Sequence, residues 1–269
     1  LDLNDYPDYA QRELLYQFLA RQFEDQASGL NSEKFTQPNY GASLYGKTAL
    51  SIAHLASFLN HKREGLFDSI MKNYFSEYAF HHCNETLFIQ YFEAQSGENL
   101  TWFRDELIRQ NPQVNYAFTR AHKNKYNKIT FKIKNLAKSQ IPFSVGYNPS
   151  LYSPSTATHL FWSPGFKGSQ NITLPDTFTQ NLRIDPSFSL PEYNRNNNIA
   201  FLNKRGSLTL RRPVRFQFLG SLDHPDKDQI YFMPVISWNM ADKTQVGLAV
   251  YNSFIPPKNL ELAAILALG

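Results

Sequence analysis

Two tyrosines and a lysine stand close together at the predicted start of an amphipathic helix. Tyr40 and Tyr45 are five residues apart, and Lys47 follows two residues later. A phenol is a neutral hydrogen-bond donor at pH 7, because its unperturbed pKa is about 10, and it pairs most strongly where negative charge develops. Tyr45 is therefore a candidate donor that faces a cleft. The alternative is an aromatic side chain that only packs at a helix end.

Other residue types that support catalysis are scattered along the chain. The sequence contains no His-Glu-x-x-His, no Gly-x-Gly-x-x-Gly, no Walker loop and no Gly-x-Ser-x-Gly. His81, His82 and Cys83 form one cluster of metal-ligating types, but adjacent residues rarely ligate one metal together. Cys83 is the single cysteine, which excludes an intramolecular disulfide. We therefore expect no metal to be bound by this chain's own residues.

Charge changes abruptly near residue 110. Residues 1–106 contain 8 basic and 15 acidic residues, whereas residues 107–175 contain nine basic and no acidic ones. The step indicates a module boundary, and the basic part is either a solvated face or a surface for an anionic partner. With 42% apolar and 15% aromatic residues, the chain has ample material for buried cores.

Apolar spacing predicts antiparallel helices up to about residue 110. On the first helix, Leu14, Leu15, Phe18, Leu19 and Phe23 predict one buried stripe. A helix over about residues 44–59 is expected to bury Ala49, Ile52, Ala53, Ala56 and Leu59. Further helices are predicted after Gly65, from Glu85 to Gln95 with Asn84 as N-cap and Gly97 at the end, and after Asn99.

Beyond Pro112 the apolar period changes to two. Ile129, Phe131 and Ile133 alternate with lysines, which predicts a half-buried antiparallel strand. Short strand signals recur over residues 143–147, 159–162 and 171–174, at the spacing of a small sandwich. A polar, turn-rich stretch over 185–198 reads as an ordered connector, and strands are expected over 214–219, 230–239 and 245–251 and from Leu260 onward.

These patterns predict a multi-domain α+β fold. An antiparallel helical domain over residues 1–112 is expected to precede an immunoglobulin-like β-sandwich over 113–185. Residues 186–269 then supply the connector and a C-terminal antiparallel β region, which is a candidate start of a barrel because aromatic residues lie near its strand ends. A soluble sheet is the alternative for that region.

Several segments resemble one enzyme family. YGASLYGKTAL, LFDSIMKNYFSEYAF and YFEAQSGENLTWFRDEL resemble the part of M1-family (gluzincin) zinc aminopeptidases that follows their zinc site. NYAFTRAHKN, FWSPGF, NITLP and RIDPSFSLPEYNRNNN resemble the sandwich of M1-like proteins from Bacteroidetes-type bacteria. Thr48 departs from the family, which often has Gly after the lysine.

The resemblance implies a C-terminal fragment of an M1-like zinc metallopeptidase. Tyr45 would stabilise the oxyanion that forms when zinc-activated water attacks a peptide carbonyl, and Tyr40 would support it. Zinc would belong to the parent protein, bound by an upstream domain, since the zinc-binding segment is absent from this sequence. The isolated chain is therefore expected to be inactive, with the upstream domain and a peptide substrate as partners and no nucleic acid.

The same resemblance places the protein in a bacterial cell envelope, either the periplasm or the outer membrane. A signal peptide is not part of the sequence. The alternative function is a non-catalytic envelope-anchoring or binding module, in which the basic sandwich meets an anionic partner and the aromatic C-terminal strands meet the outer membrane.

Overall fold

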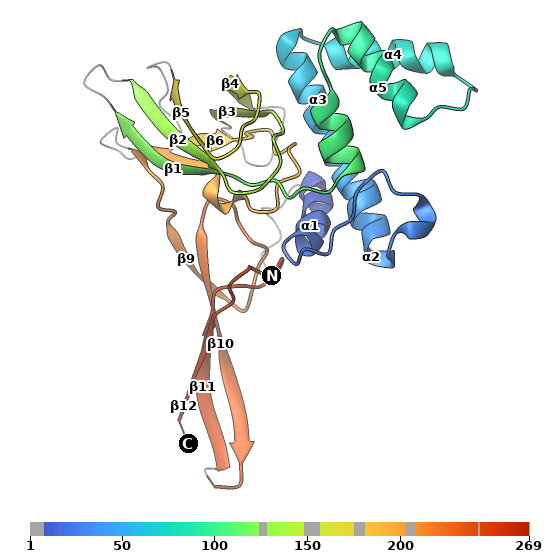
Figure 1. Cartoon of the computed structure of the whole chain (residues 1–269). Helices are drawn as coiled ribbons and strands as arrows, with labels where there is room; N and C mark the ends of the chain where they lie inside the picture. Colours follow the sequence, from blue (N-terminus) through green and yellow to red (C-terminus); the bar gives the residue numbers. More distant parts are fainter. Residues whose placement is uncertain are drawn as a thin grey trace.

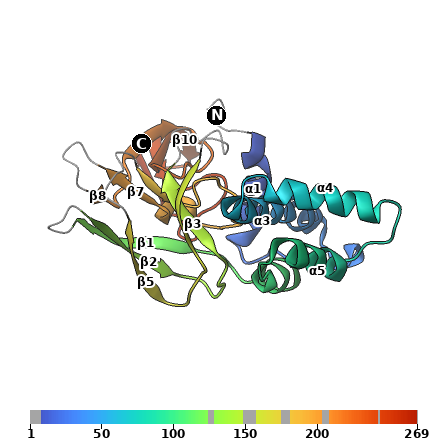
Figure 2. The ribbon, with the colours of Figure 1, turned by 90° about the horizontal axis from the view of Figure 1, so that it is seen from above.

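The structure, a computed structural model, describes residues 8–123, 128–147, 157–174, 181–202, 208–241 and 243–268. Its helices lie on one side and two sheets on the other (Figures 1 and 2). A long ribbon of strands projects away from both, as Figure 1 shows. The fold is α+β, with an N-terminal helical part and sheets whose pairings are antiparallel except for one in the C-terminal sheet, where the sequence predicts antiparallel strands. No helix in the described ranges has both the length and the apolar character that crossing a membrane requires.

One long continuous helix dominates the helical part. The helical segments are α1 (Asp8–Ala20), η1 (Ser32–Lys34), α2 (Gln37–Asn39), η2 (Tyr40–Lys47), α3 (Thr48–Lys62), α4 (Leu66–Tyr78), α5 (Glu85–Ser96) and η3 (Trp102–Arg109). Segment η2 is π-helical and continues directly into α3, so the predicted second helix is longer at both ends. The bounds of α5 agree with prediction, because the Asn84 side chain accepts a hydrogen bond from the Leu87 N–H at 2.9 Å and Gly97 is left-handed.

The predicted apolar stripe of the first helix is confirmed at Leu19, which is buried, and wrong at Leu15, Phe18 and Phe23, which are exposed. Leu15 and Phe18 are 43% and 40% exposed, whereas the face that is turned inward carries Glu13, Gln17 and Arg21. Those three polar side chains are spaced by four residues and lie on one side of the helix. They are buried because residues far along the chain supply their hydrogen-bond and ion-pair partners. The spacing of apolar residues in the sequence gives no information about such partners.

The predicted face of α3 is also displaced. Of its five expected core residues only Leu59 is fully buried, and Ala53 is exposed. The buried side chains are Leu50, Ser51, His54, Leu55, Phe58 and Leu59. The prediction relied on the alanines and therefore chose the wrong face. The helix instead buries its larger side chains together with His54, and both ring nitrogens of His54 have hydrogen-bond partners.

Two sheets face one another across a shared core. The strands of this part are β1 (Tyr116–Lys123), β2 (Ile129–Asn135), β3 (Phe143–Tyr147), β4 (Thr158–Ser163), β5 (Ser169–Leu174), β6 (Leu182–Ile184), β7 (Ile199–Leu202) and β8 (Leu208–Thr209). The sheet orders are β1-β2-β5 and β4-β3-β6-β7-β8. The rings of Tyr116 and Phe143, one from each sheet, have centroids 4.2 Å apart. The alternation predicted for β2 is confirmed, since Ile129, Phe131 and Ile133 are buried and the intervening lysines are exposed.

The stretch over residues 185–198 is ordered and deeply buried. It contains the short helix η5 (Arg195–Asn197), and Asp185, Glu192 and Arg195 are among its most enclosed side chains. Strands β7 and β8 return to the five-stranded sheet after it, so this sheet continues past the predicted domain boundary at residue 185. The division into three domains itself stays a prediction.

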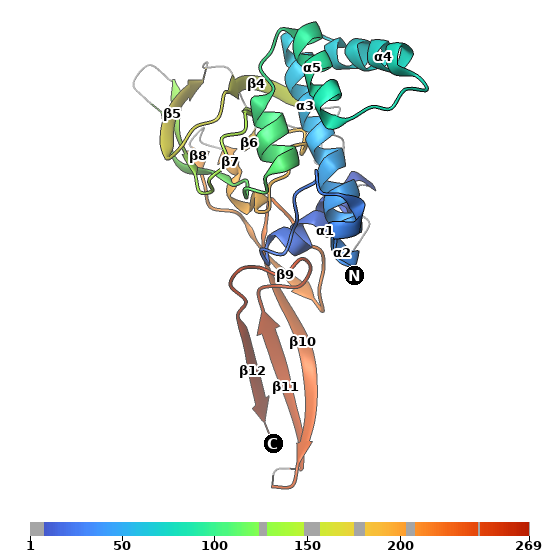
Figure 3. The ribbon, with the colours of Figure 1, turned by 45° about the vertical axis from the view of Figure 1, so that its right-hand side comes forward.

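The C-terminal strands form a separate sheet. It consists of β9 (Val214–Phe218), β10 (Asp228–Asn239), β11 (Lys243–Tyr251) and β12 (Ala263–Leu268), in the order β12-β11-β10-β9 (Figure 3). The β9–β10 pairing is parallel and the other two are antiparallel. The register places Ile236 opposite Val246, and Val246 opposite Leu268, so these exposed apolar side chains share one face.

Candidate functional site

Tyr40 and Tyr45 form an exposed aromatic pair on η2. Their ring centroids are 5.6 Å apart at an interplanar angle of 67°, and the two side chains are 44% and 62% exposed. A hydrogen bond with Tyr40 raises the pKa of Tyr45. Because the π-helical winding of η2 widens this turn, successive side chains differ in direction from those of an α-helix, and such segments are frequent at functional sites.

Lys47 anchors η2 on its buried side. Its ammonium is buried, lies 3.6 Å from the Asp25 carboxylate and hydrogen-bonds the Asn111 side chain. It also lies 5.8 Å from the centre of the Tyr16 ring. Burial lowers the pKa of Lys47, although Asp25 opposes the change. The lysine of the sequence motif is therefore a structural anchor, and it holds η2 against α1 and the chain that follows α1.

A second set of hydrogen bonds fixes the start of η2. The Asn39 side chain donates to the Glu24 carbonyl at 2.8 Å, and the Ser43 hydroxyl donates to Asn39 Oδ1 at 2.6 Å. The Gln26 N–H donates to both Asn39 Oδ1 and Ser43 Oγ, each at 3.1 Å. With both sides of the segment fixed, the two exposed phenols project from a rigid base.

Apolar side chains of α1 lie exposed next to this pair. Segment η2 packs against α1, and Leu15 lies so close to Gly41 that a Cβ there would come within 3.2 Å of it. Leu15 and Phe18 occupy one side of α1 because they are three residues apart. Leu15 therefore places an exposed apolar side chain beside the start of η2.

The histidines do not gather into a metal centre. The residues that the structure describes include no group of three or more His, Cys, Asp or Glu side chains placed to hold a metal ion. His81 and Cys83 lie exposed between α4 and α5. His54 is buried, with Nε2 at 2.7 Å from the Pro142 carbonyl and Nδ1 at 3.1 Å from the Ser189 hydroxyl. Burial lowers the pKa of His54, although the nearby Asp185 carboxylate opposes the change.

A buried ion-pair cluster centres on Arg195. Its Nε donates to Glu13, its Nη1 to Asp185 at 2.9 Å and its Nη2 to the Leu190 carbonyl at 2.7 Å. Burial raises the pKa of Glu13, although Arg195 opposes the change. Burial alone would raise the pKa of Asp185 too, but Arg195, His54 and the Leu190 N–H together lower it. The cluster joins α1 to the stretch over 185–198.

A second buried ion pair and a buried carboxyl group extend this cluster. Arg21 pairs with Asp223 at 2.9 Å and donates to the Tyr193 carbonyl at 2.9 Å. Glu192 accepts hydrogen bonds from the Tyr116 N–H at 2.8 Å and from the Asn198 side chain at 2.6 Å. Burial raises the pKa of Glu192 to about 8. These groups satisfy one another inside the protein, so their arrangement is suited to holding the helical part and both β parts together.

The sequence did not predict this cluster. It also did not predict a cavity lined by Phe58, Trp102 and Trp162 beside α3. Glu13 and Arg195 are 182 positions apart, and no local pattern relates them. The available signal was the occurrence of Glu13, Gln17 and Arg21 at four-residue spacing along α1 and the residue that follows it. For Tyr40 and Tyr45, the structure brings the two predicted residues together and exposes both.

Among the solved structures that are similar to this chain is an aminopeptidase, a distant neighbour. No family model matches the sequence, and no curated protein matches it. The crystal structure of Legionella pneumophila aminopeptidase A in complex with aspartic acid is similar with a TM-score of 0.43 and 16% sequence identity, over 68% of this chain and 22% of that one. The chain thus spans about a fifth of the length of that enzyme. This structural neighbour is an aminopeptidase, but the similarity is too low to assign a family or an activity.

Proposed function

We propose that this chain is part of a peptidase of the aminopeptidase type, in which Tyr45 donates a hydrogen bond to the oxyanion formed during peptide-bond hydrolysis. The observation that carries the proposal is the exposed Tyr40–Tyr45 pair, which projects from a π-helical segment anchored by buried Lys47. Tyr40 supports Tyr45 by accepting its hydrogen bond while no substrate is bound.

The chemistry of this pair suits such a task. A tyrosine phenol is protonated at neutral pH, and the hydrogen bond with Tyr40, which raises the pKa of Tyr45, leaves it able to donate. A donor held in place before the reaction stabilises developing charge without reorganising, which is the main requirement of an oxyanion site. The buried contacts of Lys47 to Asp25 and Asn111 supply that rigidity.

The surroundings favour a cleft that is completed by another part of the protein. Leu15 and Phe18 would be covered by an upstream catalytic domain, which would place the peptide carbonyl next to Tyr45. The zinc implied by the sequence resemblance finds no ligand set among the described residues, and no step proposed for this chain depends on it.

Steady-state kinetics of the intact protein test the proposal. Tyr45→Phe should lower kcat for an aminoacyl-anilide about 10²- to 10³-fold, as expected for the loss of one oxyanion donor. Tyr40→Phe should have a smaller effect, and Tyr78→Phe on α4 serves as the matched control. An unchanged kcat for Tyr45→Phe would leave Tyr45 as a surface aromatic only.

A second candidate function rests on the apolar face of the C-terminal sheet. Ile236, Trp238 and Val246 are exposed on the projecting ribbon, and Leu266 and Leu268 continue their face onto β12. Such a face fits an envelope-anchoring module whose ribbon contacts membrane lipid. The exposed lysines of β2 would meet anionic head groups.

Flotation with anionic phospholipid vesicles tests this second function. Ile236→Glu should abolish association with the vesicles, because it puts a charge on the apolar face. Ser237→Glu, which points to the opposite face of β10, should leave much of it intact. Equal binding by both variants, or no binding by the unaltered protein, would exclude the ribbon as the anchor.

A further inference from the structure

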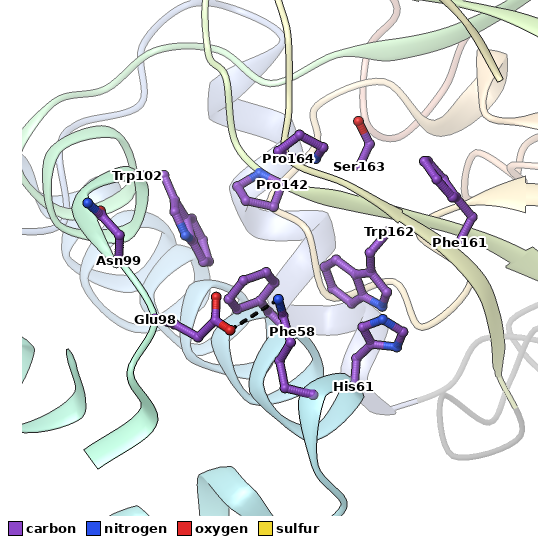
Figure 4. A pocket seen from close by; sticks show the side chains of 11 residues that line it. Phe58, His61, Glu98, Asn99, Trp102, Pro142, Phe161, Trp162, Ser163 and Pro164 are labelled. Atoms are coloured by element: carbon purple, nitrogen blue, oxygen red, sulfur yellow. Dashed lines mark ion pairs between the residues drawn. The ribbon is translucent and has the colours of Figure 1, made fainter. Parts of the chain in front are cut away.

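A cavity of about 660 Å³ lies where the C-terminal end of α3, the α5–η3 connection and β4 meet (Figure 4). Phe58, His61 and Lys62 enter it from α3, Glu98 and Trp102 from the connection and the start of η3, and Trp162 from β4. Its volume is in the range of small-molecule sites. Tyr45 and His61 are 16 positions apart on the continuous η2–α3 helix, or roughly 24 Å, so the cavity is separate from the tyrosine pair.

Three aromatic rings give the cavity its shape. The Phe58 ring lies 5.4 Å from that of Trp102 and 5.5 Å from that of Trp162, at interplanar angles of 74° and 73°. Figure 4 shows the two indoles on opposite sides of Phe58. His61 lies beside Trp162 at 5.7 Å and 31°. The face of an aromatic ring is electronegative, so this arrangement attracts positive charge.

The ammonium group of Lys62 already lies over one of these rings. The Lys62 ammonium lies 5.3 Å from the centre of the Phe58 ring and 3.1 Å from the Glu98 carboxylate. The two side chains are 43% and 29% exposed, so the pair stands at the mouth of the cavity. An exposed ion pair of this kind contributes little to stability and is readily exchanged for another.

The remaining charges of the cavity are compatible with a cationic ligand. Among its lining residues, Lys62 and Glu98 are the groups that are charged at neutral pH, since burial and the neighbouring Lys62 lower the pKa of His61. When Lys62 swings outward, the cavity retains the Glu98 carboxylate opposite three aromatic rings.

We infer that this cavity binds organic ammonium groups, with the cation over Phe58 between Trp102 and Trp162 and with Glu98 as counter-ion. Lys62 occupies the position in the absence of a ligand and competes with it. The class of ligand comprises quaternary and primary alkylammonium compounds, including such groups on larger molecules.

Tryptophan fluorescence gives a direct measurement. The chain has three tryptophans, two of which line the cavity, so Trp238→Phe removes the third from the signal. We titrate this protein with tetramethylammonium chloride and with choline chloride, using sodium chloride at equal ionic strength as the control. A saturable change with both organic cations, and none with sodium, is expected.

Two substitutions should shift the Kd in opposite directions. Lys62→Met removes the competing ammonium and should lower the Kd about fivefold, whereas Glu98→Gln removes the counter-ion and should raise it about fivefold or more. Lys72→Met on exposed α4 controls for the loss of one surface charge. Both cavity substitutions are at partly exposed positions, so both proteins should fold, and circular dichroism checks this.

Three outcomes would overturn the inference. One is the absence of saturable binding by either cation. Another is weaker binding in Lys62→Met, which would make the lysine part of the site instead of a competitor. The third is binding of a neutral sugar, methyl glucoside, with no response to the cations, which would assign the aromatic rings to stacking on a pyranose.

Discussion

Replacing Arg195 by methionine should destabilise the protein strongly, because it leaves two buried carboxylates without their partner. Arg195 pairs with both Glu13 and Asp185, and the three side chains are at most 9% exposed. Removing one member of a buried ion pair costs about 3–5 kcal/mol. Asp185 keeps hydrogen bonds from the Leu190 N–H and the Ser189 hydroxyl, so we expect a loss near the lower end, about 3 kcal/mol.

Urea unfolding at pH 7 measures this loss. Arg104→Met provides the control, since Arg104 pairs with Asp105 at the surface and its loss should change stability far less. Adding Glu13→Gln to Arg195→Met should recover part of the stability by removing one of the unpaired charges. A loss below about 1 kcal/mol for Arg195→Met, or no recovery in the double variant, would refute the view that the cluster holds α1 in place.

Three further substitutions test other contacts. Asn84→Ala should lower the free energy of unfolding by about 1 kcal/mol, because the α5 N-cap bond to Leu87 is lost; a change below about 0.3 kcal/mol would contradict this. Leu19→Ala should lower the free energy of unfolding by about 2–5 kcal/mol, and Phe18→Ala, at an exposed position, much less. Equal losses in stability would show that Phe18 is packed as closely as Leu19. Between pH 4.5 and about 8 the protonated Glu192 of the folded state should make stability fall with rising pH, by at most about 1.4 kcal/mol per unit; Glu192→Gln should remove this slope, and an unchanged slope would assign it to other groups.

Local sequence patterns predicted where helices and strands begin and end, but they did not predict which faces of α1 and α3 are buried. The Asn84 cap, the Gly97 end and the alternation of β2 depend on neighbouring residues, and each agrees with the structure. The faces of α1 and α3 depend on partners supplied by residues 185–223, by Pro142 and by Trp162 on β4, so apolar spacing alone could not determine them.

The two candidate sites also differ in how far they could be predicted from local sequence. Tyr40 and Tyr45 are close in sequence and could be singled out, although their exposure on a π-helical segment could not. The aromatic cavity draws Phe58, Trp102 and Trp162 from three distant segments, and the sequence offered no sign that they meet. The stretch over 185–198 was predicted as an ordered connector. Its polar composition gave no sign that Asp185 and Arg195 would pair with each other in the interior.

The affinity of the intact protein for a phosphonate analogue of its peptide substrate is the decisive measurement for the role of Tyr45. If Tyr45 binds the oxyanion, Tyr45→Phe lowers kcat/KM and the affinity for the analogue by the same factor, about 10²- to 10³-fold, while affinity for the uncleaved product amino acid is unchanged. Equal weakening of analogue and product, or no peptide hydrolysis by the intact protein, would contradict the proposed function.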